Sequence, residues 1–478
     1  MTAHPKPSMG TMSIPVRQAN LLLCLIVVWM MLPVGRTAAQ PMTLDACVEQ
    51  ALVYNNQVLL AEQSIVRSRA DVSSARARRL PSLNTTLMNY SHSRTGPSVR
   101  VQDNPTGGVD PVTGDRIFAE ETTRIPGVDR STYAFSAGIN HTLYDGGEGR
   151  RAHGAARQSL AAAELRFRAS RAAIAFTVKR NYYNLLKAQE LVEVQKSAAD
   201  LSHRRLEDAE SRLEVGATTR VDVLRLQVAV DNASADLINA EQQVLLAGAM
   251  LNHAMGRDLS APIETTSIDG AVSTASLHAS DPQSARQYLQ ELVARARQLN
   301  PDIEALRHTE RAADLNLKAA QAAWHPRMSG GVSYSRNNEV FDRVYGGLDE
   351  NYRLNASLSL SYNLFDGGLR SAGIRRSQSS LATARLILDQ QERDISLAVE
   401  TVYLEMVRLE RILGIAERTA DLAAQDLRLA EERYRVGKGR LLEVLDAQVG
   451  QTQSAGNRVS TRYDLAVAQA DMERLTGD

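Results

Sequence analysis

The chain has 478 residues, of which 44% are hydrophobic and 5% aromatic, and its formal net charge is +0. This hydrophobic content excludes a fully disordered chain, and the balanced charge gives no indication of a nucleic acid or an acidic substrate as partner. Ala, Arg, Leu and Gln dominate long stretches, a composition that favours extended helices over one large globular core.

Residues 1–39 are typical of a cleaved signal peptide. Arg17 precedes an apolar run over residues 21–32, and the small residues Thr37, Ala38 and Ala39 follow it. A membrane-anchoring helix is the alternative, but a run of about a dozen apolar residues is short for a bilayer span. No later stretch approaches about 18 consecutive apolar residues, so a membrane location must come from something other than a helix.

Cysteine usage is sparse. Cys24 lies inside the apolar run, so the mature chain keeps only Cys47 and no intrachain disulfide is expected. Neither cysteine lies at a lipid-attachment site, so we expect no lipid anchor.

The most informative feature is an internal duplication. LYDGG at residues 143–147 recurs as LFDGG at 364–368, and RLEVG at 212–216 recurs as RYRVG at 433–437 in the same register. We therefore predict two structural repeats. They cover residues 40–256 and 284–478, and a linker over 257–283 is expected to wrap around the outside of a helical tube.

Each repeat predicts a helix, two strands, a long helix, a turn and a further helix. The long helices have about 65 residues without internal proline and would be about 100 Å long. No single core buries such a helix, so it must pack laterally on other helices in a coiled-coil manner. The predicted helices are 43–80, 149–213 and 218–255 in the first repeat, and 284–324, 369–435 and 441–475 in the second.

The predicted strands alternate between apolar and polar residues. The alternation is unbroken over residues 352–364, clear at 133–142 and 328–335, and weakest at 83–90. Strands of about 9–11 residues with one apolar face are typical of a transmembrane barrel, and a soluble sheet with one wet face is the alternative. Strand length, the signal peptide and tyrosines near the strand ends favour the barrel. Four strands cannot close a barrel, so several subunits must contribute to it.

Two segments between the strands, 91–130 and 337–350, are predicted to be loops outside the barrel. The first contains many glycines and prolines, which interrupt regular structure.

The repeated motifs resemble the TolC-like family of outer-membrane efflux and secretion channels, and the resemblance covers residues 40–478. Its most specific elements are the two Arg-x-x-Val-Gly turns and the two strand-to-helix junctions. The resemblance implies a mainly α fold with transmembrane β-strands. Three subunits would form a twelve-stranded barrel in the outer membrane, continued by a twelve-helix periplasmic tube. The junction residues are Asp145, Gly146, Gly147, Asp366, Gly367 and Gly368.

The resemblance also assigns the periplasmic tips. The turns at Val215, Gly216, Val436 and Gly437 would dock a periplasmic adaptor protein and an inner-membrane transporter. Glycine ends long helices in a left-handed conformation, so a role as helix caps alone is the alternative. We expect both roles, because the tips are also the surfaces that an adaptor can reach.

An acidic ring and a closing network are expected near the second tip. The family's cation-attracting ring falls on Glu443 and Asp446, which lie on one face of a helix. The alternative is that Glu443 only favours the helix N-terminus electrostatically. Tyr434 and Asp222 match two positions of the family's closing network. Gly439 stands where its arginine is usual, and Arg440 is adjacent.

No motif indicates an enzyme, a cofactor or a metal centre. There is no His-Glu-x-x-His sequence, Cys/His cluster or phosphate-loop lysine. A periplasmic coiled-coil adaptor is the rival class, but it would have one helical hairpin and a soluble β-rich body. For the channel we favour export of a protein such as a toxin by a type I system, with an ABC-type transporter as partner. Drug or metal efflux is the alternative.

Overall fold

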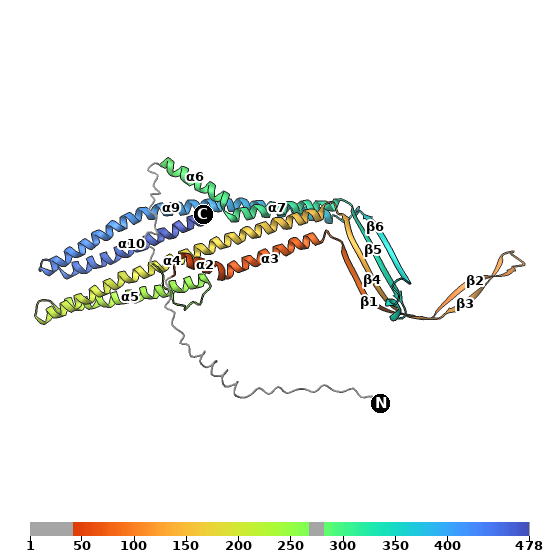
Figure 1. Ribbon diagram of the computed structural model, residues 1–478, viewed down its shortest axis with the longest axis horizontal. Helices are drawn as coiled ribbons and strands as arrows, with labels where there is room; N and C mark the ends of the chain where they lie inside the picture. Colours follow the sequence, from red (N-terminus) through yellow and green to blue (C-terminus); the bar gives the residue numbers. More distant parts are fainter. Residues whose placement is uncertain (1–41, 267–281, 478) are drawn as a thin grey trace, which may run out of the picture.

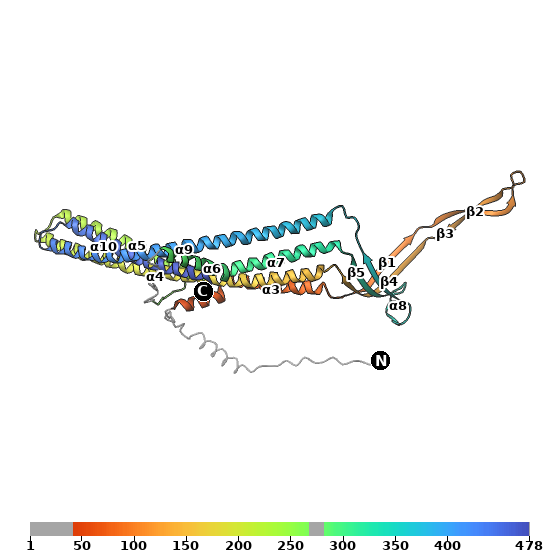
Figure 2. The ribbon, with the colours of Figure 1, turned by 90° about the horizontal axis from the view of Figure 1, so that it is seen from above.

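The computed structural model describes residues 42–266 and 282–477. The predicted signal peptide and the linker residues 267–281 lie outside the described residues. The helices run side by side in one elongated body. Two helical hairpins form one end of this body, on the left of Figures 1 and 2, and at its other end the helices lead into a β-sheet.

The helices of the first repeat differ from the sequence prediction in one place. The segment expected as a single helix over 43–80 is broken at Asn55, because its side chain accepts a hydrogen bond from the Gln57 amide at 2.8 Å and starts a new helix. The same side chain donates to the carbonyl of Ala254 at 2.9 Å. The helices are α2 (Leu44–Tyr54), α3 (Asn56–Ala77), α4 (Glu148–Glu214) and α5 (Arg220–Met255).

The second repeat breaks its first helix in the same manner. Asn300 accepts from the Asp302 amide at 3.0 Å and donates to the carbonyl of Leu475 at 3.4 Å, and Pro301 follows it. The single helix expected over 284–324 is therefore two helices and a 3-10 turn. The elements are α6 (Pro282–Leu299), α7 (Pro301–Gln321), η1 (Ala322–Trp324), α9 (Leu369–Arg435) and α10 (Leu441–Thr476). Among the described residues, no helix is both long and apolar enough to cross a bilayer.

The four-stranded sheet is antiparallel, with the order β1-β4-β5-β6. Directly paired residues share a face, and Leu83, Ile139, Val332 and Ala356 form one apolar row across all four strands. The neighbouring row on the opposite face is polar or small, so the sheet has two contrasting faces. The strands are β1 (Ser82–Thr95), β4 (Val128–Tyr144), β5 (Arg327–Asn338) and β6 (Tyr352–Ser361).

The loop predicted over residues 91–130 is wrong, because most of this segment is strand. β1 and β4 extend into it, and β2 (Ser98–Val109) pairs with β3 (Arg116–Ile125) in a hairpin that projects beyond the sheet (Figure 1). Hydrogen bonds between β2 and β3 pair most of the backbone amides and carbonyls of this segment. The glycines and prolines lie in the turns and around the register shift between Pro105 and Val109. Between β5 and β6 lies the short helix α8 (Asp342–Tyr345).

The apolar core lies midway along the molecule, where helices of both repeats meet. One cluster joins α2, α3, α4, α5 and α10, and the other joins α6, α7, α9 and α10. Tyr182 is fully buried in the first cluster, and its hydroxyl donates to the carbonyls of Met42 at 3.1 Å and Thr266 at 2.9 Å. This tyrosine therefore ties the start of the first repeat and the linker that follows it to the long helix α4.

Alkaline pH should destabilise this core. Burial raises the pKa of Cys47 to about 11 and the pKa of Tyr182 to about 12. Both groups bind their protons more tightly when folded, so their contribution to stability is complete below pH 9 and is lost as the pH rises through these values. We expect the midpoint of thermal unfolding, followed by circular dichroism in detergent, to fall steeply between pH 9 and 12.

Tyr182→Phe should lower the midpoint at neutral pH by removing the hydrogen bond that the hydroxyl shares between two carbonyls, and it should flatten the alkaline fall. Tyr54→Phe is the matched control, because Tyr54 is 60% exposed. An unchanged alkaline slope in Tyr182→Phe contradicts the prediction.

Candidate functional site

The strand-to-helix junctions are built by two aspartates. The Asp145 carboxylate accepts hydrogen bonds from the amides of Gly147 at 2.8 Å and Gly149 at 2.7 Å. Asp366 accepts from the Gly368 amide and the Arg370 amide, both at 3.1 Å, and its ion pair with Arg370 is 2.8 Å long. Each carboxylate satisfies amides that the first turn of a long helix leaves without partners. The junction residues therefore set where the sheet ends and each long helix begins.

The glycines of these junctions have left-handed backbone conformations. Gly146 and Gly367 both have a φ of 65°. A Cβ on Gly146 would lie 2.7 Å from the Cβ of His325, whereas a Cβ on Gly367 would meet nothing within 4 Å. Glycine is thus required by conformation at both junctions and also by packing at the first.

The two helical tips lie together at the end of the molecule opposite the sheet (Figure 1). Gly216 and Gly437 each have a φ of 73° and end a long helix. The closing hydrogen bonds are equivalent, from the amides of Ala217 and Lys438 to carbonyls five residues earlier, both at 2.8 Å. The side chains next to these glycines, Val215 and Val436, are 79% and 62% exposed. The tips thus present apolar side chains to solvent at rigid helix ends.

Glu443 and Asp446 both lie exposed at the start of α10. The Glu443 carboxylate is 3.9 Å from the Arg433 guanidinium, a weak pairing across the turn. No other ion pair holds these two carboxylates within the described residues. Both are therefore available to solvent or to a neighbouring copy.

The structure does not join Tyr434, Asp222 and Arg440 to one another within one chain. The Tyr434 ring lies 5.9 Å from the Arg212 guanidinium of the other hairpin. Asp222 accepts a hydrogen bond from the Thr219 hydroxyl at 2.7 Å, and Arg440 is the N-cap residue of α10 without a capping hydrogen bond from its side chain. A closing network among these residues stays a prediction that would need contacts between copies.

Gly439 occupies the tightest point of the second tip. Its amide donates to the Arg433 carbonyl at 3.0 Å. A Cβ here would lie 3.0 Å from the amide nitrogen of Tyr434. A side chain at this position would require its neighbours to shift by a few tenths of an ångström, so glycine fits the turn without adjustment.

Sequence reasoning missed a polar cluster that joins the two hairpins. The Arg205 guanidinium on α4 bonds both the Glu431 carboxylate on α9 and the Gln448 side chain on α10. Gln448 is buried and donates to the Ser202 hydroxyl at 2.8 Å. Gln448 follows Leu441 and Val444 at helical spacing, so a glutamine on the apolar face at the start of α10 was the available sequence signal.

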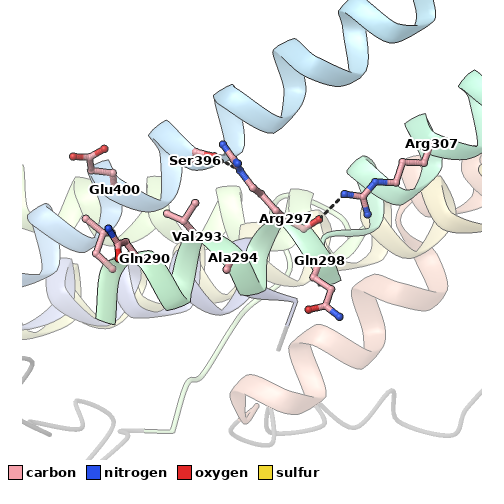
Figure 3. A pocket seen from close by; sticks show the side chains of 9 residues that line it. Gln290, Val293, Ala294, Arg297, Gln298, Arg307, Ser396 and Glu400 are labelled. Atoms are coloured by element: carbon pink, nitrogen blue, oxygen red, sulfur yellow. Dashed lines mark hydrogen bonds between the residues drawn. The ribbon is translucent and has the colours of Figure 1, made fainter. Parts of the chain in front are cut away.

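An open groove of about 570 Å³ lies between α6 and α9 (Figure 3). Arg297 Nε donates to the Ser396 hydroxyl at 2.8 Å, and Arg307 donates to the Arg297 carbonyl at 3.3 Å. These polar groups bond one another and position the helices. No group of three or more His, Cys, Asp or Glu residues that could hold a metal occurs in the described parts of the chain.

A family model described as outer membrane efflux protein matches residues 47–257 and 292–478. The chain belongs to the outer membrane efflux protein family. It is 26% identical over 360 residues to the outer membrane efflux protein BepC of Brucella suis, covering 74% of each chain. It is 23% identical over 320 residues to the outer membrane protein TolC of Vibrio cholerae, covering 66% of this chain and 70% of that one.

The fold is also that of solved channels. A structure of CusC superimposes with a TM-score of 0.75 at 17% identity, covering 92% of this chain and 94% of that one. Membership of the outer membrane efflux protein family makes this chain a transport protein of the bacterial outer membrane with a long periplasmic helical extension, and not an enzyme.

Alanine at Gly146 should destabilise the protein more than alanine at Gly367. Both substitutions carry the backbone strain of a left-handed alanine, about 1–2 kcal/mol. Only Gly146→Ala adds the overlap with His325, which should cost about 1–3 kcal/mol more. The measurement is the midpoint of thermal unfolding of each purified variant. Equal losses would show that packing at the first junction contributes nothing.

Proposed function

We propose that three copies of this chain form an outer-membrane exit channel, a twelve-stranded barrel continued by a twelve-helix tube. The observation that carries the proposal is the open sheet. β1 and β6 are its edges, and each pairs with only one neighbour among the described strands. Unpaired backbone groups are not tolerated in hydrocarbon, so the edge of one copy must pair with the edge of the next.

The helical hairpins support the same assembly. α4 packs against α10 within one chain, and there Leu201 of α4 and Leu445 of α10 are partly buried. Their equivalents in the other repeat are Leu422 on α9, 64% exposed, and Leu224 on α5, 54% exposed. The duplicated pattern thus pairs α9 of one copy with α5 of the next. Exposed apolar residues at coiled-coil spacing need such a partner.

A ring of three copies would also determine what the tips and the acidic residues face. Three copies would place Glu443 and Asp446 around the periplasmic opening, where carboxylates attract cations. Val215, Gly216, Val436 and Gly437 would form the surface that meets a periplasmic adaptor. The adaptor in turn connects the channel to an inner-membrane transporter.

Purified protein in a planar bilayer should give discrete, cation-selective openings, and its mass should be that of a trimer. Replacing Glu443 and Asp446 together with alanine should lower the cation-to-anion permeability ratio severalfold, because the carboxylates no longer concentrate cations at the opening. Glu207 and Glu210 on α4 are exposed at the same spacing and provide the control pair. A monomer without conductance would overturn the channel, and an unchanged ratio would remove the acidic ring alone.

For the cargo we propose protein export by a type I system with an ABC-type transporter. The lack of a lipid-attachment cysteine and of Met- or His-rich tracts supports this choice over drug or metal efflux. The name of BepC, an efflux protein, favours the second candidate, small-molecule efflux.

Deleting the gene in its host should abolish the appearance of one or more proteins in the culture medium, measured by mass spectrometry. Plasmid-borne wild-type protein should restore them. An unchanged set of secreted proteins together with increased sensitivity to drugs or metals would exclude protein export and support efflux.

A further inference from the structure

Exposed apolar side chains mark every junction between the helices and the four-stranded sheet. Their exposed fractions range from 46% for Tyr144 to 85% for Phe365. Large aliphatic and aromatic residues at such a boundary are typical of a membrane–water interface. We name these residues the junction belt, which consists of Leu80, Tyr144, Trp324, Phe365 and Leu369.

A set of exposed arginines follows the junction belt on its helical side. They lie at the end of α3, the start of α4 and the start of α9, all within about 12 Å of a junction along the helix axis. Among the described residues, none of them forms an ion pair with a carboxylate. We name this set the arginine collar, which consists of Arg76, Arg78, Arg79, Arg150, Arg375 and Arg376.

The junction carboxylates at the same level are engaged elsewhere. Asp145 accepts from backbone amides, Glu148 pairs with Arg327 at 2.6 Å, and Asp366 pairs with Arg370 at 2.8 Å. The collar therefore carries positive charge that these carboxylates do not balance.

In a closed ring of copies, the position of the collar would bring arginines of adjacent copies close together. α3 contacts α4, α4 contacts α7, and α7 contacts α9, so α3 and α9 are the outer helices of the layer next to the sheet (Figure 2). Closing the ring brings α9 of one copy beside α3 of the next. Arg375 and Arg376 then approach Arg76, Arg78 and Arg79, and these like charges repel unless anions lie between them.

We propose that the arginine collar binds the phosphate groups of anionic phospholipids in the membrane leaflet that faces the helical tube. This inference rests on the proposed insertion of the sheet into the membrane. The guanidinium group binds phosphate through two parallel hydrogen bonds, and a long arginine side chain reaches a headgroup while its stem stays near apolar residues. Basic residues beside an apolar belt gain further attraction from an anionic leaflet. The collar thus fixes the depth of the channel in the membrane and relieves repulsion between copies.

Trp324 of the junction belt reports on this contact. Once the predicted signal peptide is removed, it is the only tryptophan of the chain. The full mature protein is reconstituted in phosphatidylcholine vesicles that contain either dibromo-phosphatidylcholine or dibromo-phosphatidylglycerol, and quenching of Trp324 fluorescence is measured. We expect a preference for the anionic quencher of about fivefold or more at low salt, and its loss at high salt.

The variant Arg78→Gln/Arg79→Gln/Arg375→Gln/Arg376→Gln should lose this preference while quenching by dibromo-phosphatidylcholine persists. The matched control removes four exposed arginines far from the sheet, in Arg225→Gln/Arg411→Gln/Arg418→Gln/Arg428→Gln, and should keep it. Lysine at the four collar positions should retain part of it. If the glutamine variant does not assemble, the lysine variant and the salt dependence of the wild type still decide the question.

Two results would overturn the inference. One is equal quenching by both lipids in the wild type. The other is a preference for the anionic lipid that survives in the glutamine variant, and an altered ion selectivity of that variant would then place the collar arginines in the lumen. Absence of quenching by either lipid would instead contradict insertion of the sheet, and with it the proposed channel.

Discussion

The unpaired edges of the four-stranded sheet are the constraint on which the rest of the proposed assembly depends. A backbone amide or carbonyl left without a partner in hydrocarbon costs several kcal/mol, and β1 and β6 each present a row of such groups. A single copy cannot satisfy them, because both edges belong to one open sheet. The requirement to pair edges fixes a ring of copies, and the ring then determines which helices meet along the tube.

Rigid connections carry this constraint from the sheet to the tips. Asp145 directly follows β4 and caps α4, and Asp366 caps α9 a few residues after the end of β6, so the strands guide the orientation of both long helices. Midway along the molecule, Asn55 and Asn300 each start a new helix and also bond the end of α5 or α10. The shorter helices thereby continue one another along the long ones. These few polar contacts thus keep the shorter helices alongside the long ones over most of their length.

Charge is distributed unevenly along the elongated molecule although the whole chain is neutral. Arginines without carboxylate partners gather beneath the sheet, and Glu443 and Asp446 lie exposed at the opposite end. Between them, Arg205 holds Glu431 and Gln448 and joins the two hairpins close to the tips. The hairpins are therefore linked by a polar cluster at the level where an opening would have to widen.

The sequence by itself was sufficient for the long helices and the junctions. The ends of α4, α9 and α10 lie within one residue of those expected. Glycines with a positive φ mark the turns before or after these helices, and other residues rarely adopt that conformation. These glycines are Gly146, Gly147, Gly216, Gly367, Gly368 and Gly437. The alternation of apolar and polar residues likewise located the four strands of the sheet. Local patterns were sufficient where the conformation of a single glycine set a helix end, or where the apolar face of a strand set its position in the sheet.

Only the tertiary structure decided the remaining features, since they depend on residues distant in sequence. The breaks at Asn55 and Asn300 are stabilised by helix ends about 200 and 175 residues away, and the β2–β3 hairpin forms by pairing segments that composition alone marks as loop. The link from Arg205 to Gln448 likewise requires three helices from both repeats. Periodicity and motifs report on neighbours along the chain, whereas these contacts are set by which surfaces the fold brings together.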